Sequence, residues 1–304
     1  MRRTITLLFI ILLLFFSGRY MYHRRDTKTS LPATDGQSGS EIDRIVSLSP
    51  GITETLFALD LGDRVVGVTR FCRYPPEAQE KADVGGFVDP NYEVITALRP
   101  DLVFVLEVHG DAVNYLDELD ITHVTVRNEK VSDILDSILT IGKACGVENR
   151  AREMVDSIQD RMQSLSMKTR DLSKPTVLLS IGRLAGSGSL TEVYVAGQNT
   201  FYDELITCAG GTNAYHGHTI PYPVISAEGL LALNPDIIID LVPTLGQLGL
   251  DESDILREWD NMAEIDAVKN GRIHVVSNTF AVIPGPRFIM FLEEMAGFIH
   301  PGLQ

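Results

Sequence analysis

The chain has few cysteines and few basic residues for its length of 304 residues. Its cysteines, Cys72, Cys145 and Cys208, are odd in number and lack metal-type spacing, so no cysteine metal site is expected. The spacing leaves open whether one pair is oxidised. Lysine and arginine number 26 against 41 aspartates and glutamates, a formal net charge of −15. This balance excludes a general nucleic-acid surface, which would be basic.

Basic residues are scarcer still beyond the first 25 positions. Residues 1–25 contain five arginines and no acid, so 26 less five leaves 21 basic residues against 41 acidic ones. The same segment contains an apolar run from Ile5 to Phe16 after a basic start, which is typical of an export signal. No Ala-x-Ala cleavage site follows it. We therefore predict a periplasmic or extracytoplasmic protein, with residues 1–25 as a signal peptide or a membrane anchor.

A flexible tether is predicted over residues 26–42, which are polar and contain almost nothing apolar. Strand-like and helix-like segments alternate after it, a pattern that predicts parallel α/β sheets. The expected strands are Arg44–Leu48, Val65–Val68, Leu102–Leu106, His123–Val126, Val177–Ile181, Ile237–Leu241 and Ile273–Val276.

One long helix is predicted from Glu148 to Arg170, because apolar residues recur there at helical spacing without glycine or proline. The apolar stripe consists of Ala151, Met154, Val155, Ile158, Met162 and Leu165. The chain thus divides into an N-terminal lobe (43–147), a connecting helix (148–174) and a C-terminal lobe (175–304). A helical connector resists large opening.

Residues 91–103 and 226–238 repeat one pattern at a fixed offset. Each has a helix-capping residue, a glutamate two places on, Ala-Leu, Pro-Asp and then a β-branched or leucine run. Each copy predicts a short helix stopped by proline and followed by a buried strand. Two copies predict two similar lobes, with a ligand cleft between them.

Several motifs together resemble one known family. They are Arg44–Pro50 with Thr53-Glu54, Val66–Thr69 leading to Tyr74-Pro75-Pro76, Val84-Gly85-Gly86, and both repeats. Over about residues 43–300 the chain resembles the helical-backbone (class III) substrate-binding proteins of ABC importers, which capture cobalamin, iron-siderophores or haem. The resemblance implies an α/β fold of two similar lobes with parallel sheets joined by one long helix. It also implies a monomer that delivers its ligand to an ABC permease.

The resemblance is greatest to the cobalamin-binding branch, through Arg73–Ala78 and Ile220–Pro223. Phe71, Phe87 and Tyr222 lie in loops where α/β proteins bind ligands, and flat rings suit a planar macrocycle. Anchoring of each loop against its sheet is the alternative. In that branch tryptophans match Phe87 and Tyr222, so a corrinoid, haem and a ferric siderophore all stay open as the ligand.

Arginines near these loops are candidate ligand-binding residues. Arg287 starts the last expected helix and matches a family arginine that reaches the cleft, where it would grip a phosphate, propionate or catecholate. Arg73, and less strongly Arg70, suit the same role. A surface arginine at a helix start is the alternative for Arg287, although the helix dipole disfavours it.

The repeated glutamates, Glu93 and Glu228, have two interpretations. Each follows a capping residue, where an acid stabilises the helix start through the dipole. The resemblance implies instead that one glutamate per lobe meets arginines of the permease. Two such contacts on a rigid frame would fix the docking register.

The sequence gives little support to a metal-binding site or to an enzyme. His109, His216 and His218 are expected to be exposed loop histidines, so neither a metal site nor a cofactor is predicted beyond a chelate carried as ligand. An axial bond from a histidine to a bound haem or corrinoid stays open as the alternative. Cys72 lies between two arginines, but no paired base accompanies it, and we predict no enzyme activity. A membrane-tethered sensor or scavenger that uses no permease is the alternative from another class.

Overall fold

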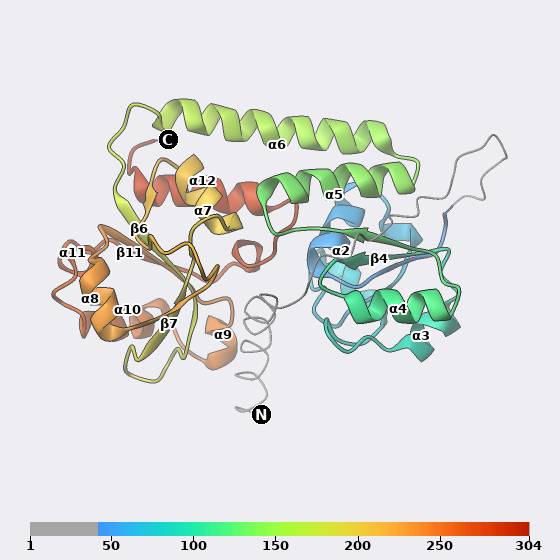
Figure 1. The fold of residues 1–304 in the computed structure, drawn as a ribbon, viewed down its shortest axis with the longest axis horizontal. Helices are drawn as coiled ribbons and strands as arrows, with labels where there is room; N and C mark the ends of the chain where they lie inside the picture. The colour runs from blue at the N-terminus through green and yellow to red at the C-terminus, as the bar shows by residue number, and fades with distance from the viewer. Residues whose placement is uncertain (1–41, 304) are drawn as a thin grey trace. The chain divides into compact units, whose positions relative to one another are not determined.

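The computed structural model describes residues 42–303 (Figure 1). They form two compact units: an N-terminal unit of residues 42–160 with Ile283–Arg287, and a C-terminal unit of Arg161–Val282 with residues 288–303. The predicted export segment and almost all of the tether lie outside the described residues. Within residues 42–303 no helix has the length and apolar character needed to cross a bilayer.

The N-terminal unit contains a five-stranded sheet in the order β3-β2-β1-β4-β5, and every neighbouring pair is parallel. Three of its strands have the bounds predicted from sequence, whereas the first strand is shorter and β3 was not predicted. The strands are β1 (Ile45–Ser47), β2 (Val65–Val68), β3 (Ala82–Asp83), β4 (Leu102–Leu106) and β5 (His123–Val126).

Helices cover both faces of this sheet. Figure 1 shows α3 (Tyr92–Leu98) and α4 (Gly110–Glu118) on one side, with α2 (Pro50–Ala58) and α5 (Val131–Ala144) on the other. Side chains alternate between the faces along each strand, as in any pleated sheet. One face packs in a core of Val46, Leu48, Val84, Ile95, Val103, Val105, Ala112 and Leu116. Two short 3₁₀ turns, η2 (Gly62–Arg64) and η3 (Pro76–Glu80), complete the unit.

The long predicted helix is present as α6 (Glu148–Thr169), one residue shorter than expected. Its predicted stripe is buried at Ala151, Val155, Ile158 and Leu165. A Cβ on Gly142 of α5 would lie 2.3 Å from the Cβ of Ala151, so glycine permits the close approach of these two helices. From Arg161 onward α6 belongs to the C-terminal unit.

The C-terminal unit is built on a mixed sheet. Its order is β11-β10-β6-β7-β9, with β8 also paired to β6. β10, β11 and β8 run parallel to their partners, but β7 is antiparallel to both β6 and β9. The strands are β6 (Thr176–Arg183), β7 (Glu192–Val195), β8 (Thr212–Asn213), β9 (Val224–Ser226), β10 (Ile237–Leu241) and β11 (Ile273–Val276).

The antiparallel strand β7 and its partner β9 are additions to the predicted parallel sheet. The connection 184–191 between β6 and β7 is too short for a crossover helix, so the chain returns as a hairpin. Trp259, which is fully buried, lies in the core of this unit. The helices are α7 (Phe201–Cys208), α8 (Ala227–Leu233), α9 (Leu245–Leu248), α10 (Glu252–Asp260), α11 (Asp266–Lys269), α12 (Phe288–Ile299) and the 3₁₀ turn η4 (Thr279–Ala281).

The sequence repeat is a structural repeat. α3 and α8 are each seven residues long, and each is capped by a side chain, Asn91 or Ser226, that accepts a backbone N–H. Each ends in a left-handed residue, Arg99 at φ 46° and Asn234 at φ 39°, before the Pro-Asp pair. A buried five-residue strand follows in both units.

The aspartate of each Pro-Asp pair holds the start of the neighbouring strand. Asp101 Oδ2 accepts the backbone N–H of Asp43 at 2.9 Å and that of Arg44 at 2.8 Å. Asp236 Oδ2 accepts the backbone N–H of Thr176 at 2.7 Å and its hydroxyl at 2.8 Å. The repeat therefore encodes the junction of one helix with two adjacent strands.

Candidate functional site

The loops that follow β2, β3 and β4 meet at the carboxyl edge of the first sheet, where open α/β sheets bind ligands. The first two loops are joined by a hydrogen bond from the backbone N–H of Arg70 to the carbonyl of Gly85, 3.0 Å long. Phe71 is half-buried in the first loop and Arg73 is exposed. Phe71, Arg73 and Phe87 therefore lie in loops at the same edge of one unit.

A tight turn presents Phe87. Gly85 and Pro90 pair as an isolated antiparallel bridge, and the N–H of Gly86 donates to the carbonyl of Asp89 at 3.1 Å. Gly85 has a φ of 99°, which favours glycine, and a Cβ on Gly86 would lie 1.9 Å from Asp89 Oδ1. The two glycines are therefore needed for the turn, and Phe87 at its tip is half-exposed.

His109 lies under this turn and is not the exposed loop residue that we predicted. Its side chain is 5% exposed, and its ring centroid lies 4.4 Å from that of Phe87 in an edge-to-face contact. The prediction of an exposed His109 failed because a histidine just after a buried strand can fold back on the end of that strand. Here Nδ1 of His109 accepts the backbone N–H of Leu106, the last residue of β4, at 3.1 Å. His216 and His218 are exposed, as predicted.

Cys72 is buried beneath the same edge. Its Sγ lies 3.1 Å from the hydroxyl of Thr53 and 3.2 Å from that of Thr69. Burial raises the pKa of the Cys72 thiol, the opposite of what an activated thiolate needs. All three cysteines are free, which answers the question of an oxidised pair.

Arg287 is held by a partner that sequence reasoning missed. Its Nε and Nη2 donate to the two carboxylate oxygens of Glu54, at 2.9 and 2.6 Å. The guanidinium carbon lies 3.6 Å from the ring centroid of Tyr74. Burial raises the pKa of Glu54, and the pairing with Arg287 opposes that shift. Much of the arginine's hydrogen-bonding capacity is thus directed at Glu54.

Close backbone packing accompanies the Arg287–Glu54 pair. A Cβ on Gly51 would lie 2.3 Å from the carbonyl oxygen of Pro284, so the segment Ile283–Arg287 lies directly against the start of α2. Glycine at position 51 is what allows the two backbones to approach.

In the C-terminal unit, Tyr222 is buried rather than projecting. It is 7% exposed and makes an edge-to-face contact with Tyr202, with ring centroids 6.4 Å apart. The preceding residue, Pro221, accepts the N–H of Gly197 at 2.7 Å and so ties the loop to the body of the unit. This placement fits the alternative of loop anchoring that the sequence left open for this ring.

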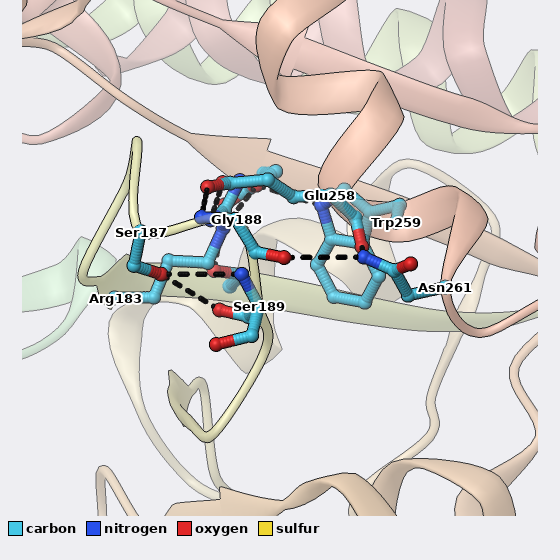
Figure 2. Close-up of polar contacts among 9 residues, drawn as sticks. Arg183, Ser187, Gly188, Ser189, Glu258, Trp259 and Asn261 are labelled. Atoms are coloured by element: carbon cyan, nitrogen blue, oxygen red, sulfur yellow. Dashed lines mark hydrogen bonds and ion pairs between the residues drawn. The ribbon is translucent and has the colours of Figure 1, made fainter.

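A buried polar cluster lies at the end of β6 (Figure 2). The guanidinium of Arg183 pairs with Asp240 of β10 at 2.8 Å and with Glu258 of α10. Asp240 also accepts the hydroxyl of Ser180 at 2.7 Å and the indole N–H of Trp259 at 2.8 Å. No short sequence motif marks this cluster, because its members come from three separate elements.

The cluster also holds the hairpin between β6 and β7. Glu258 Oε1 accepts the backbone N–H of Gly188 at 2.8 Å, as Figure 2 shows. Asn261 donates to the carbonyl of the same glycine at 3.3 Å. The hairpin is therefore fixed to α10 by contacts at its tip.

Both candidate docking glutamates are exposed at the second position of their helices, Glu93 in α3 and Glu228 in α8. Among the described residues, neither takes part in an ion pair within 4.0 Å. Their carboxylates are thus available to a partner in solution. The helix-dipole role applies equally well to both positions.

Metal-ligating side chains do not gather in the part of the chain that the structure describes. Within residues 42–303 no group of three or more histidine, cysteine, aspartate or glutamate side chains is placed to hold an ion.

The chain matches known proteins along most of its length. Residues 45–278 match the family described as periplasmic binding protein. An uncharacterised ABC transporter substrate-binding lipoprotein, YvrC of Bacillus subtilis, is 32% identical over 85% of this chain and 80% of its own. A cobalamin-binding protein of Halobacterium salinarum is 27% identical over 90% of this chain and 76% of its own.

A solved structure with the same fold is the periplasmic heme-binding protein RhuT of Roseiflexus sp. RS-1. It superposes with a TM-score of 0.72 at 26% identity, covering 88% of this chain and all of the other. The chain belongs to the periplasmic binding protein family. The predicted class, a substrate-binding protein of an ABC importer with a class III α/β fold, is confirmed.

Proposed function

We propose that the protein captures a corrinoid, cobalamin-like ligand outside the cytoplasm and delivers it to an ABC permease. The observation that carries this proposal is the carboxyl edge of the first sheet, where Phe71 and Phe87 lie in loops joined by the Arg70–Gly85 hydrogen bond. Aromatic faces in such a position suit a large, flat and partly apolar ligand. A relative named as a cobalamin-binding protein supports the corrinoid as first choice.

Haem or a ferric siderophore is the second candidate ligand class. The named ligand of RhuT supports haem. The resemblance implies tryptophans at the positions of Phe87 and Tyr222 in the cobalamin-binding branch, and Tyr222 is buried in this chain. These two differences keep the second ligand class open. In both cases the metal would arrive inside the chelate, and the protein would need no resident cofactor.

The arginines have unequal parts in this proposal. Arg73 is exposed two residues after Phe71, and its guanidinium would bind a ligand phosphate or carboxylate. Arg287 is 16% exposed at its side chain and paired with Glu54, so its contribution would be mainly to hold Tyr74 and α2 in place. No enzymatic step is part of the proposal, since Cys72 is buried with a raised pKa.

We further propose that Glu93 and Glu228 contact arginines of the permease. Each carboxylate is exposed, belongs to a rigidly capped helix and lies on a different unit. An exposed ion pair adds little affinity by itself, but two pairs, one on each unit, act together by bivalency.

Membrane attachment through residues 1–25 is also proposed. The Bacillus relative is named a lipoprotein, but this sequence has no cysteine before Cys72, which is buried. A lipid-modified cysteine is therefore not available in residues 1–71. The apolar run would serve as the anchor, and fractionation of cells expressing the full chain or a chain without residues 1–25 would test this.

A spectroscopic titration tests the ligand. Purified protein is incubated with cyanocobalamin, haem or a ferric siderophore, passed over a desalting column and examined for retained colour. We expect cyanocobalamin to be retained, with Phe87→Leu weakening binding about fivefold, since an aromatic contact contributes about 1 kcal/mol. Tyr115→Leu, at an exposed ring on α4, is the matched control. Retention of haem alone would select the second candidate, and no retained colour would reject both.

A further inference from the structure

His109 contains a buried polar atom that the fold does not satisfy. Its side chain is 5% exposed, and Nδ1 accepts the backbone N–H of Leu106 at 3.1 Å. Nε2 is buried and has no hydrogen-bond partner among the described residues. Buried polar atoms in native proteins are nearly always paired, so an unpaired one in a ligand-binding loop points to a partner that arrives with the ligand.

The contact with Leu106 fixes which nitrogen carries the proton. Because Nδ1 accepts an N–H, it must present a lone pair, and a neutral imidazole then carries its proton on Nε2. Burial lowers the pKa of His109 to about 4, which keeps the ring neutral at physiological pH. Nε2 is therefore a neutral N–H donor.

This tautomer also decides against metal coordination. An axial bond from Nε2 to cobalt or iron requires a lone pair on that nitrogen, which would move the proton to Nδ1. A proton on Nδ1 would face the N–H of Leu106, so two donors would meet at 3.1 Å. The backbone thus holds His109 in the form that donates.

Phe87 packs directly against the ring that carries this donor. The two ring centroids are 4.4 Å apart with an interplanar angle of 68°, and Phe87 is half-exposed at the tip of its turn. A ligand that contacts the Phe87 ring therefore lies next to the residue that packs on His109.

We propose that His109 is a specificity-determining residue whose Nε2–H donates a hydrogen bond to a carbonyl or carboxylate oxygen on the rim of the bound chelate. The inference rests on the proposed function. Amide side chains of a corrin and propionates of a haem both supply such an oxygen. A ligand without a rim acceptor would not gain this hydrogen bond and would bind less tightly than a ligand that has one.

Two substitutions separate donation from packing. His109→Phe keeps a ring against Phe87 but removes the donor, whereas His109→Gln keeps an N–H donor. His216→Phe, at an exposed loop histidine, is the matched control. We expect His109→Phe to weaken binding of the retained probe, cyanocobalamin or haem, about tenfold. His109→Gln should stay within about threefold of the unsubstituted protein, and the control should be unchanged.

Nuclear magnetic resonance of the unsubstituted protein gives a readout that folding of the variants does not affect. Long-range ¹H–¹⁵N spectra should show His109 protonated at Nε2, and addition of the probe should bring its Nε2–H signal downfield and protect it from exchange. A proton on Nδ1 would overturn the inference. Unchanged affinity of the His109→Phe variant for the probe would also overturn the inference. A visible spectrum in which the probe loses an axial ligand on going from the unsubstituted protein to His109→Phe would overturn it as well. If the unsubstituted protein retains neither probe, the proposed function fails and the role of His109 falls with it.

Discussion

The guanidinium of Arg287 and the carboxylate of Glu54 form a two-point ion pair across 233 positions of sequence. The Glu54 side chain is 1% exposed and that of Arg287 16%. The pair fixes the segment Ile283–Arg287 against α2, beneath the ring of Tyr74. It explains how a residue so near the end of the chain becomes part of the N-terminal unit.

Arg287→Ala should destabilise the protein by about 3 kcal/mol, because it leaves the Glu54 carboxylate buried without its partner. Urea unfolding followed by circular dichroism measures the loss. The double variant Glu54→Gln with Arg287→Ala should recover part of it. Arg161→Ala breaks a similar but exposed pair with Glu293 and should cost under about 1 kcal/mol. Equal losses in the two arginine variants would contradict the buried-pair interpretation.

Asp240→Asn should have a comparable effect in the C-terminal unit. Asp240 is fully buried and accepts from Arg183, Ser180 and Trp259, so removal of its charge weakens three contacts together. We expect a loss of about 3 kcal/mol in free energy of unfolding. Asp260→Asn, on the exposed side of the same helix α10, should change stability by less than about 0.5 kcal/mol. A small effect of Asp240→Asn would show that water replaces its contacts.

His109 should make stability fall in mild acid. Its pKa is about 4 in the folded protein and near 6.5 when unfolded, so the unfolded chain binds the proton first. Its contribution is complete above about pH 6.5 and is lost as pH falls towards about 4, by up to about 3 kcal/mol. Unfolding at pH 7 and pH 4.5 should differ more for the unsubstituted protein than for His109→Gln. His216→Gln should behave like the unsubstituted protein.

Charge reversal tests docking independently of ligand binding. Glu93→Lys with Glu228→Lys should lower the affinity for the cognate permease more than tenfold, since both ion pairs become repulsive. Retention of ligand should be unchanged. Glu252→Lys, at an exposed residue in the first turn of helix α10, controls for loss of the helix-dipole interaction. Normal uptake by the double variant, with ligand binding intact, would contradict the docking role of the two glutamates.

Local features of the fold were predictable from sequence. The strands Leu102–Leu106 and Ile237–Leu241 and the length of α6 follow from apolar runs and periodicity. The Pro-Asp repeats predicted where the two short helices end. They did not predict the hydrogen bonds from the neighbouring strands to Asp101 and Asp236. That role needs a partner about sixty residues away.

The parts that sequence reasoning missed all depend on distant partners. In the sequence, Glu54 looks like an ordinary helix residue, because its partner Arg287 is 233 positions away. Arg183 likewise shows no sign of its two partners, Asp240 and Glu258, which lie on other elements. Strand β7 and the edge strand β9 are short and partly polar, so their pairing depends on the hairpin rather than on periodicity. Burial of His109 and Tyr222 likewise follows from how their loops fold back.

Trp259 is the single tryptophan of the chain, and it lies in the core of the C-terminal unit with its indole bonded to Asp240. Its fluorescence therefore reports on that unit while the N-terminal unit contributes no indole signal. Circular dichroism reports on both. Comparing the two signals through one urea titration would show whether the units unfold together or in succession, without any label being added to the protein.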